Sequence, residues 1–330
     1  MTNILVVGGA GYIGSHTCLD LASKGFTPVV YDNLSNGHAE FVRWGPFEHG
    51  DIRDRARLDA VLDTYKPAAI VHFAALIEVG ESVRNPTGFF ENNVAGTLTL
   101  LSAAQAAGID KLVFSSTCAT YGLPQAMPMD ETHPQAPINP YGRSKLIVEQ
   151  MLSDLDAYEG FRSVALRYFN AAGADPEGRV GEWHSPETHA IPLAIEAALG
   201  RRSDFKVFGW DYDTRDGTCV RDFVHVLDLA DAHSRAVQYL LDGGDSVALN
   251  LGTGDGTTVK ELLSAIEAVS GKSFPVEYVG RREGDSPMLV ADNGKARSVL
   301  GWQPRFDLTA IIETAWNWHS SEQWRERSAA

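Results

Sequence analysis

The feature that most constrains the fold is a short apolar run followed at once by a glycine-rich loop. Residues 4–7 (ILVV) are apolar, as expected for a strand buried on both faces of a parallel sheet. The loop 8–14 (GGAGYIG) follows, and a helical pattern begins after it. Glycines at Gly8, Gly11 and Gly14 allow a tight turn, close approach of a pyrophosphate and close packing of helix on strand. Strand, loop and helix together predict a dinucleotide site with phosphates at the helix N-terminus, although a plain strand-to-helix turn would share the pattern.

The end of the second predicted strand indicates which dinucleotide is bound. Residues 28–31 form this strand, and Asp32 and Asn33 follow it, about 20 residues past the glycine loop. A carboxylate at this place accepts hydrogen bonds from both adenosine ribose hydroxyls and repels a 2′-phosphate. No Arg or Lys occurs among residues 33–36. The sequence therefore predicts NAD rather than NADP.

Strands and helices alternate along the first half of the chain. This pattern predicts an α/β fold, a doubly wound parallel sheet of the Rossmann type, with a smaller mixed α/β lobe after it. We expect a dinucleotide-binding domain over residues 1–170 and a second domain over 171–330, with about 222–252 returning to the first. Further strands are expected at 47–49, 69–73, 111–116 and 162–169, and helices at 85–107, 191–199, 261–269 and 308–318. Asp51, Ile52, Ala74 and Ala75 stand at carboxyl ends of strands, where adenine and phosphate contacts fall in such sheets.

The charge and cysteine content restrict the partners and the compartment. With 28 basic and 43 acidic residues the chain has a net charge of −15, which argues against nucleic-acid or anionic-membrane partners. The three cysteines form no CxxC pair, so we expect a reduced, cytoplasmic setting and no metal site. The chain enters a strand directly after residue 3, without a signal segment, and has no apolar run near the 18 or so residues of a membrane span.

Tyr141 and Lys145 stand one helical turn apart, just after Pro140, at the start of a predicted helix. A tyrosine that takes a proton from a sugar hydroxyl near neutrality needs its pKa lowered by roughly 3 from the usual 10. The Lys145 ammonium can supply part of this preference for the phenolate, and a second cation, such as an oxidised nicotinamide ring, can supply the rest. The same spacing also occurs by chance in helices, so the rest of the chain has to support this interpretation.

Taken with the glycine loop, Asp32 and the strand end at 115–117, this pair resembles the extended short-chain dehydrogenase/reductase family. Within it, the chain is most similar to the UDP-glucose (UDP-galactose) 4-epimerases, over nearly all of its length. The segments that carry the resemblance are GGAGYIGSHT at 8–17, VGESV at 79–83, NNVAGT at 92–97, NPYGRSK at 139–145, LRYFNAAGA at 166–174, the stretch 211–233, and RREGD at 281–285.

The resemblance implies reversible, NAD-dependent epimerisation of UDP-glucose and UDP-galactose at C4 through a transient 4-keto sugar. Tyr141 would act as the base on the 4-hydroxyl, Thr117 would hold and relay that proton, and Lys145 would bind the nicotinamide ribose and keep Tyr141 ionised. The implied cofactor residues are Gly8, Gly11, Tyr12, Ile13, Gly14, Asp32, Asn33, Asp51, Ile52, Phe73, Ala74, Ala75, Asn92, Ser115, Tyr141, Lys145 and Tyr168.

The second domain is expected to hold the UDP-sugar. By the same resemblance Asn170 and Arg221 approach the phosphates, and Arg282 clamps the diphosphate. Asp285 meets a ribose hydroxyl, and His189 borders the uracil together with Phe208. The implied substrate residues are Thr117, Tyr141, Asn170, His189, Val207, Phe208, Arg221, Arg282 and Asp285. A homodimer is expected through the helix that starts near residue 85 and the helix of Tyr141, because these helices pair in many relatives.

Three positions depart from the family pattern. Val7 stands where many relatives have Thr, and Ile77 stands where some epimerases have a cofactor-contacting Lys. Leu289 replaces a large Tyr that some epimerases place against the sugar, which leaves room for an N-acetyl group at C2 and predicts that UDP-N-acetylhexosamines are also accepted.

Other activities remain as alternatives. A UDP-pentose 4-epimerase would use the same residues. A sugar-nucleotide dehydratase or decarboxylase on the same scaffold is a further alternative, and elimination by a dehydratase is disfavoured because Cys118 and Ala119 follow Thr117 where a dehydratase has an acid pair. A non-catalytic dinucleotide-binding regulator would not need the Tyr141 and Lys145 pair. The lone histidines His72 and His225 are expected in the core.

Overall fold

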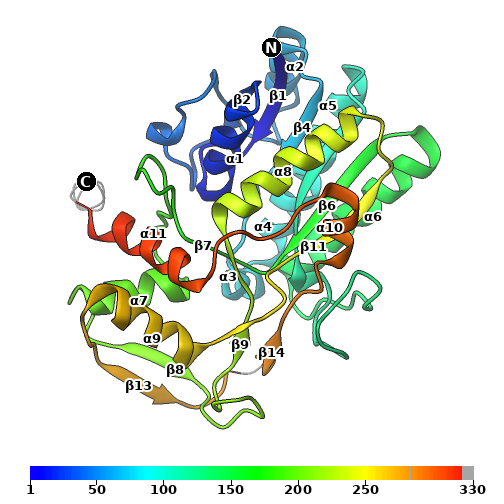
Figure 1. The fold of residues 1–330 in the computed structure, drawn as a ribbon. Coiled ribbons are helices and arrows are strands. Elements are labelled where there is room, and N and C mark those ends of the chain that lie inside the picture. Colours follow the sequence, from blue (N-terminus) through cyan, green and yellow to red (C-terminus); the bar gives the residue numbers. More distant parts are fainter. Residues whose placement is uncertain (283, 322–330) are drawn as a thin grey trace.

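The computed structural model describes residues 1–282 and 284–321, and its centre is one parallel sheet (Figure 1). The strand order is β11-β6-β5-β4-β1-β2-β3, and every neighbouring pair is parallel. The predicted doubly wound parallel sheet is confirmed. The strands are β1 (Thr2–Val7), β2 (Phe26–Asp32), β3 (Phe47–His49), β4 (Ala69–His72), β5 (Lys111–Thr117), β6 (Arg162–Tyr168) and β11 (Val247–Leu251).

Helices cover both faces of the sheet, and β1 shows why its sequence is continuously apolar. Ile4 and Val6 face one core, whereas Leu5 and Val7 face the other, because successive side chains of a strand point to opposite faces. The first core is closed by α1 (Tyr12–Ser23), α8 (Val226–Leu241) and α10 (Gly294–Leu300). The second is closed by α2 (Arg55–Tyr65), α5 (Thr97–Ala106) and α6 (Pro140–Glu159).

The predicted helix over 85–107 is interrupted in the structure. It consists of α4 (Pro86–Phe90), a π-helical turn η2 (Glu91–Gly96) and α5, with α3 (Val79–Arg84) just before them. Asn93 in the π-helical turn binds the backbone of Leu76 twice, accepting from its N–H at 2.8 Å and donating to its carbonyl at 3.0 Å. The interruption therefore anchors the loop that follows β4.

The smaller lobe lies at the carboxyl edge of the sheet, below it in Figure 1. Its own apolar core joins α7, α9 and α11 to short strands. Its elements are β7 (Asn170–Ala172), α7 (Ala190–Ala198), β8 (Phe205–Phe208), β9 (Val220–Arg221), β10 (Phe223–His225), β12 (Thr257–Thr258), α9 (Val259–Ser270), β13 (Val276–Val279), β14 (Met288–Leu289) and α11 (Leu308–Ser320). β8 pairs with β13, β10 with β7, and β9 with both β12 and β14. Two 3-10 turns, η1 (Ala39–Phe41) and η3 (Cys118–Thr120), complete the described elements.

The segment 222–252 lies mostly against the larger domain. Its helix α8 packs on α1, and its strand β11 extends the central sheet beside β6 (Figure 1).

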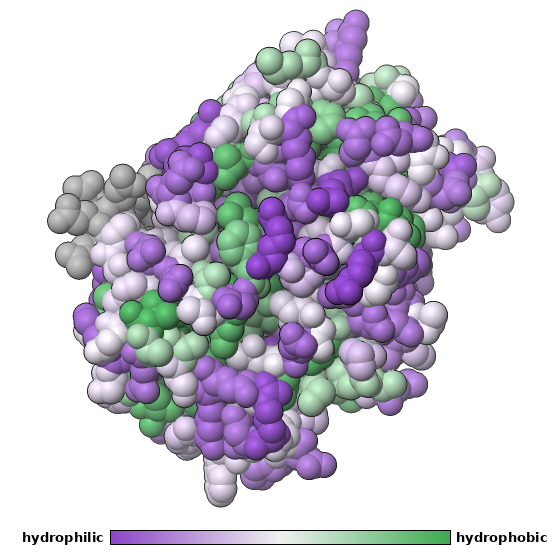
Figure 2. Space-filling view, in the orientation of Figure 1, coloured by the Kyte–Doolittle hydropathy of each residue, from purple (hydrophilic) through white to green (hydrophobic). Residues whose placement is uncertain are grey.

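Two predicted parts of the chain lie outside the described residues: Glu283, in the RREGD segment, and residues 322–330 of the predicted second domain. Within the described part, no helix is both long and apolar enough to cross a membrane. On the face seen in Figure 2, hydrophobic side chains appear in small groups among hydrophilic ones.

Candidate active site

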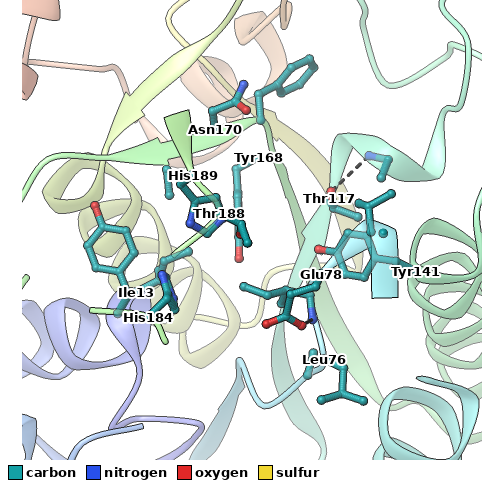
Figure 3. A pocket seen from close by; sticks show the side chains of 18 of the residues that line it. Ile13, Leu76, Glu78, Thr117, Tyr141, Tyr168, Asn170, His184, Thr188 and His189 are labelled. Atoms are coloured by element: carbon teal, nitrogen blue, oxygen red, sulfur yellow. Dashed lines mark hydrogen bonds between the residues drawn. The ribbon is translucent and has the colours of Figure 1, made fainter. Parts of the chain in front are cut away.

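One cavity of about 1570 Å³ lies where the carboxyl ends of the strands meet the small lobe. Apart from Asp51, every residue predicted above for cofactor or substrate lies on its wall. Figure 3 shows Thr117 and Tyr141 on one side of the cavity and Ile13 and His184 on the other. The structure therefore brings the predicted cofactor and substrate residues to one place.

Asp51 does not lie on this wall. Its carboxylate accepts hydrogen bonds from Arg53 at 2.7 and 2.8 Å and from Asn33 at 3.0 Å. The hydrogen bonds from Arg53 are the main cause that lowers the pKa of Asp51 well below its usual range. Sequence position alone had placed Asp51 with the cofactor residues, but its side chain is turned toward these partners.

The glycine loop forms a cradle that no larger residue could make. Gly8 has φ +83°, and a Cβ on it would lie 2.6 Å from the backbone nitrogen of Ala74. A Cβ on Gly14 would lie 2.2 Å from the carbonyl oxygen of Gly8. The helix α1 begins here with no acidic residue in its first turn, so its free amides can meet a phosphate without repulsion.

Asp32 lies at the carboxyl end of β2, on the wall of the same cavity. One carboxylate oxygen accepts from the N–H of Ala10 at 3.0 Å and the other from the N–H of Leu34 at 2.8 Å, which fixes the side chain. Burial raises the pKa of Asp32, and these backbone hydrogen bonds lower it. The nearby lining residues Asn33, Ser35, Asn36 and Gly37 carry no positive charge. The cradle and this carboxylate fit NAD and offer nothing to a 2′-phosphate.

The start of α6 positions the Tyr141 and Lys145 side chains. Asn139 caps the helix by accepting from the N–H of Gly142 at 2.8 Å, and Pro140 occupies its first turn. Thr117 ends β5 and its hydroxyl accepts from the N–H of Ala119 at 3.1 Å, drawn as a dashed line in Figure 3. Strand end and helix start thus bring the three predicted catalytic residues to one wall.

Burial shifts the pKa values of both Tyr141 and Lys145. Burial raises the pKa of Tyr141, and a hydrogen bond with Thr117 opposes that rise. Burial also lowers the pKa of Lys145 to about 7. Its ammonium donates to the carbonyl of Ser115 at 2.8 Å and lies 4.8 Å from the centre of the Phe114 ring. The expectation that Lys145 and an oxidised nicotinamide ring together favour the Tyr141 phenolate stays a prediction; in the protein alone, desolvation dominates the pKa values of both groups.

Residues of the small lobe place cations and an aromatic face on the opposite part of the cavity. The guanidinium of Arg282 lies over the Phe208 ring, 3.6 Å from its centre. Arg221 donates to the carbonyl of Ser286 at 2.9 Å, and its other terminal nitrogen lies 3.5 Å from the Asp285 carboxylate. A stacked guanidinium keeps its edge free for a phosphate, so this arrangement suits a nucleotide diphosphate.

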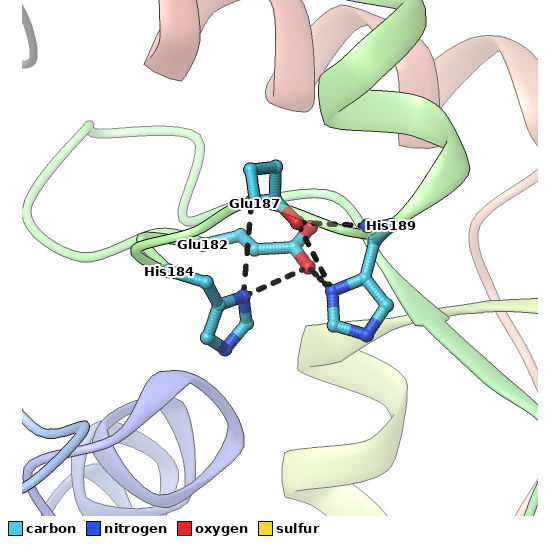
Figure 4. A group of neighbouring side chains, drawn as sticks. All are labelled: Glu182, His184, Glu187 and His189. Atoms are coloured by element: carbon cyan, nitrogen blue, oxygen red, sulfur yellow. Dashed lines mark hydrogen bonds and ion pairs between the residues drawn. The ribbon is translucent and has the colours of Figure 1, made fainter. Parts of the chain in front are cut away.

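Several lining residues were missed in the sequence. Glu182 and His184 lie on the cavity wall beside the predicted His189, and Glu187 joins them (Figure 4). Burial lowers the pKa of His184, but its interactions with the two glutamates outweigh burial and raise it to about 9. The same balance raises the pKa of His189 to about 10. The spacing E-x-H-x-x-E-x-H over 182–189 was the available signal.

Ile77, which was left out of the predicted site, also lies on the cavity wall, next to Glu78.

The two lone histidines predicted in the core, His72 and His225, are buried there. His72 is 2% exposed and binds the Thr97 hydroxyl at 2.8 Å, and His225 is 1% exposed and binds the Thr314 hydroxyl at 3.0 Å.

The glycine cradle, the Asp32 carboxylate and Tyr141 beside the buried Lys145 and Thr117 together define a nicotinamide-dinucleotide enzyme of the extended short-chain dehydrogenase/reductase type. Residues 4–252 match the model of the NAD dependent epimerase/dehydratase family, and the chain belongs to this family.

Individual relatives are similar over almost the whole chain. A UDP-glucose 4-epimerase of Rhizobium leguminosarum bv. trifolii is 77% identical over 317 residues, which cover 96% of this chain and 97% of that protein. The crystal structure of UDP-glucose 4-epimerase from Brucella ovis in complex with NAD is 52% identical with a TM-score of 0.94, covering 96% and 98% of the two chains. The UDP-Glc/GlcNAc 4-epimerase from Campylobacter jejuni is 43% identical with a TM-score of 0.85, covering 96% and 99%.

Proposed function

We propose that this protein is an NAD-dependent isomerase that reversibly converts UDP-glucose and UDP-galactose by inverting C4 through a transient 4-keto sugar. The observation that carries this proposal is the convergence of Tyr141, Lys145 and Thr117 with the glycine cradle in one cavity. The Rhizobium leguminosarum and Brucella ovis relatives, which each match 96% of this chain, are UDP-glucose 4-epimerases, and the latter was solved with NAD.

Bound NAD supplies the acceptor and donor of the C4 hydride. Gly8, Gly14 and the α1 amides hold its phosphates, and Asp32 holds the adenosine ribose. Lys145 lies on the wall of the same cavity, where its ammonium donates a hydrogen bond to the carbonyl of Ser115 at 2.8 Å and can bind the nicotinamide ribose. The chain thereby fixes both ends of the cofactor.

The chain's own groups handle the proton of the sugar. The Thr117 hydroxyl holds the 4-hydroxyl, and the Tyr141 phenolate takes its proton as C4 is oxidised. When C4 is reduced on the opposite face, Tyr141 returns the proton to the new hydroxyl oxygen. Because burial raises the pKa of Tyr141, its phenolate needs cations close by, and the Lys145 ammonium is the nearby cation on the same helix.

The small lobe holds the nucleotide while the sugar turns. Arg282 and Arg221 bind the diphosphate, with Asn170 beside them, and Phe208 with Val207 borders the uracil. We assign NAD binding to residues 1–170 and UDP-sugar binding to 171–330, with 222–252 returning to the larger domain. This division leaves the sugar between the two, next to Tyr141.

The assembly and the compartment follow as further parts of the proposal. We place the protein in the cytoplasm, because its three cysteines are free. We propose a homodimer formed by α5 and α6, where Leu98 is 53% and Tyr158 is 86% exposed. Light scattering on a size-exclusion column tests it: Leu98→Glu should yield monomers, and a monomeric wild-type protein would remove this part of the proposal.

The purified protein, with NAD present, tests the proposed reaction. Incubated with UDP-galactose it should form UDP-glucose, and with UDP-glucose it should form UDP-galactose, without net consumption of NAD. NMR of the anomeric protons distinguishes the two products. Failure to form either 4-epimer by a NAD-loaded protein would refute the proposal, and accumulation of a 4-keto-6-deoxy sugar would indicate a dehydratase instead.

Acceptance of N-acetylated sugars is the second candidate activity. Leu289 in β14 lies on the cavity wall, and the similar Campylobacter jejuni enzyme is described as a UDP-Glc/GlcNAc 4-epimerase. Leu289→Tyr should lower kcat/KM for UDP-N-acetylglucosamine at least about 10-fold and that for UDP-glucose much less, because the larger ring fills the space for the acetyl group. An absence of wild-type turnover of UDP-N-acetylglucosamine would eliminate this candidate.

A further inference from the structure

Four side chains of the metal-binding kind gather in the segment between β7 and α7. They are Glu182, His184, Glu187 and His189, and one ligand atom from each lies within 4.8 Å of all the others. Figure 4 shows both imidazoles turned toward the two carboxylates. The proposed epimerisation assigns a nucleotide-bordering role only to His189, so the convergence of all four needs its own explanation.

Three separations between imidazole nitrogens and carboxylate oxygens are close to the edges of a small coordination tetrahedron. Ligands that lie 2.0–2.2 Å from a central Zn²⁺ are roughly 3.3–3.6 Å apart. Nδ1 of His184 lies 3.5 Å from Glu182 and 3.7 Å from Glu187, and Nδ1 of His189 lies 3.3 Å from Glu187. The contact from Nδ1 of His189 to Glu182, at 2.7 Å, has the length of a hydrogen bond, and a small rotation of either side chain opens it. Glu187 also accepts from the backbone N–H groups of Thr188 and His189 at 2.7 and 2.8 Å, which fixes its carboxylate.

One nitrogen of this cluster is left without a hydrogen bond. Nδ1 of His184 is buried and has no hydrogen-bond partner among the residues that the structure describes. It points at two carboxylates at distances too long for good hydrogen bonds. A buried polar atom in this position is costly unless a partner lies between it and the oxygens. A cation at the centre of the cluster is such a partner.

The charge of the cluster also suits a divalent ion. The side chains of Glu182 and Glu187 are only 5% and 10% exposed, so their two negative charges need two positive ones nearby. Two protonated imidazoles supply them, and so does one divalent cation between two neutral imidazoles. Binding of the ion therefore leaves the net charge of the buried cluster unchanged, while the two displaced protons leave for the solvent.

We propose that Glu182, His184, Glu187 and His189 bind one Zn²⁺ ion. Two imidazole nitrogens with two carboxylate oxygens form a ligand set that Zn²⁺ accepts in tetrahedral geometry, whereas Mg²⁺ and Ca²⁺ favour all-oxygen sites. Four protein ligands leave no open position, so the ion has a structural role: it fixes the 182–189 segment, from which His184, Thr188 and His189 line the cavity. The site shares His189 with the proposed substrate cavity, but zinc binding is measured without the epimerisation assay.

Zinc titration of the full-length protein tests the proposal. After chelator treatment and dialysis, the protein is titrated with ZnCl2 in competition with a chromophoric indicator. We expect one equivalent to bind, and affinity to fall about 100-fold or more in His184→Gln and in Glu187→Gln. His49→Gln, which changes an exposed histidine outside the cluster, should bind like the wild type. No stoichiometric binding, or equal affinity in all variants, would show that the cluster only forms ion pairs.

The coordination shell gives a second test that needs no variant. Zinc-edge X-ray absorption of the 1:1 complex should show two nitrogen and two oxygen neighbours at about 2.0–2.2 Å. Zinc should also raise the melting temperature of the wild type and of His49→Gln. Sulfur neighbours, or six oxygen neighbours, would place the metal elsewhere and overturn the assignment even if the two cluster variants failed to fold.

Discussion

Two clusters of titratable side chains on different walls of the same cavity are both desolvated, but their net pKa shifts have opposite directions (Figure 3). Around Tyr141 and Lys145, burial prevails: the pKa of the phenol is raised and the pKa of the ammonium falls to about 7. Around Glu182 and His189, pairing prevails: the pKa of the histidine rises to about 10 and the pKa of the carboxyl is lowered. Burial is common to both groups, so the difference lies in the partners.

The distance to an opposite charge explains the contrast. His189 lies 2.7 Å from one carboxylate and 3.3 Å from another. The carboxylate that acts most on Lys145 is Glu149, which is engaged by Arg167 at 2.5 Å in a buried pair. Lys145 is thus left with a carbonyl and an aromatic face. Tyr141 and Lys145, the pair proposed to handle the sugar proton, therefore lack a close opposite charge, whereas the charges of Glu182 and His189 are paired with each other.

Replacing the proposed base should have the largest effect. Tyr141→Phe removes the proton acceptor and should lower kcat about 10³-fold in the epimerase assay, within the range for loss of general-base catalysis. Tyr278→Phe, a 47% exposed tyrosine on β13 away from the cavity wall, is the control and should keep full activity. Wild-type turnover by a folded Tyr141→Phe protein would remove Tyr141 from the mechanism.

Replacing Lys145 should lower the rate less than replacing Tyr141, and it should also shift the pH profile of activity. Lys145→Met should lower kcat/KM at neutral pH about 10²-fold and move the ascending limb of the pH profile to higher pH, because the phenolate loses its favourable neighbour. The exposed Lys295→Met serves as the control for loss of a positive charge. A loss of rate without any change in the pH profile would mean that Lys145 only binds ribose.

Breaking the compensated cluster should cost stability rather than proton transfer. Glu182→Gln leaves two imidazoles with one carboxylate, and we expect a loss of about 2 kcal/mol, less than for a fully buried pair because His189 is 46% exposed. Since pairing raises the pKa of His189, its contribution is full below about pH 6.5 and is lost as pH rises through about 10. Urea unfolding with a chelator present should therefore show a smaller difference from the wild type at pH 10 than at pH 6. A difference independent of pH would contradict the pairing.

Replacing a buried histidine that forms no ion pair should have the smallest effect, a change in how the free energy of unfolding depends on pH. Burial lowers the pKa of His16 and of His233 to about 4. The unfolded chain therefore binds more protons below about pH 6.5, and stability falls as pH decreases from there toward 4. His233→Gln should reduce that slope by up to about 1.4 kcal/mol per pH unit, measured by urea unfolding. An unchanged slope would mean that His233 is protonated in the folded protein.

The sequence predicted best what depends on neighbours along the chain. The apolar run of β1, the glycines at Gly8 and Gly14, and Asp32 at the next strand end are local signals, and the sheet edge brings them together by a general rule of parallel sheets. The start of α6 was also predicted correctly, because Pro140, which favours the first turn of a helix, directly precedes Tyr141.

What the sequence did not reveal depends on contacts between distant or irregular segments. The cluster at 182–189 forms only because a segment without regular structure turns its glutamates toward its histidines. The carboxylate of Asp51 accepts hydrogen bonds from Arg53 and Asn33, contacts that its position at a strand end does not predict. The raised pKa of Tyr141 follows mainly from desolvation of its side chain, which the helical spacing of Tyr141 and Lys145 does not predict.

The most direct test of the central claim is the ionisation of Tyr141 in the presence of a cationic and of a neutral nicotinamide. Ultraviolet titrations of the NAD⁺ and NADH forms, each corrected with Tyr141→Phe, isolate its phenolate absorbance. The account predicts ionisation at about pH 7 to 8 with NAD⁺ and only above about pH 10 with NADH, because the chain's own groups raise this pKa. Equal ionisation near neutrality in both forms would contradict it.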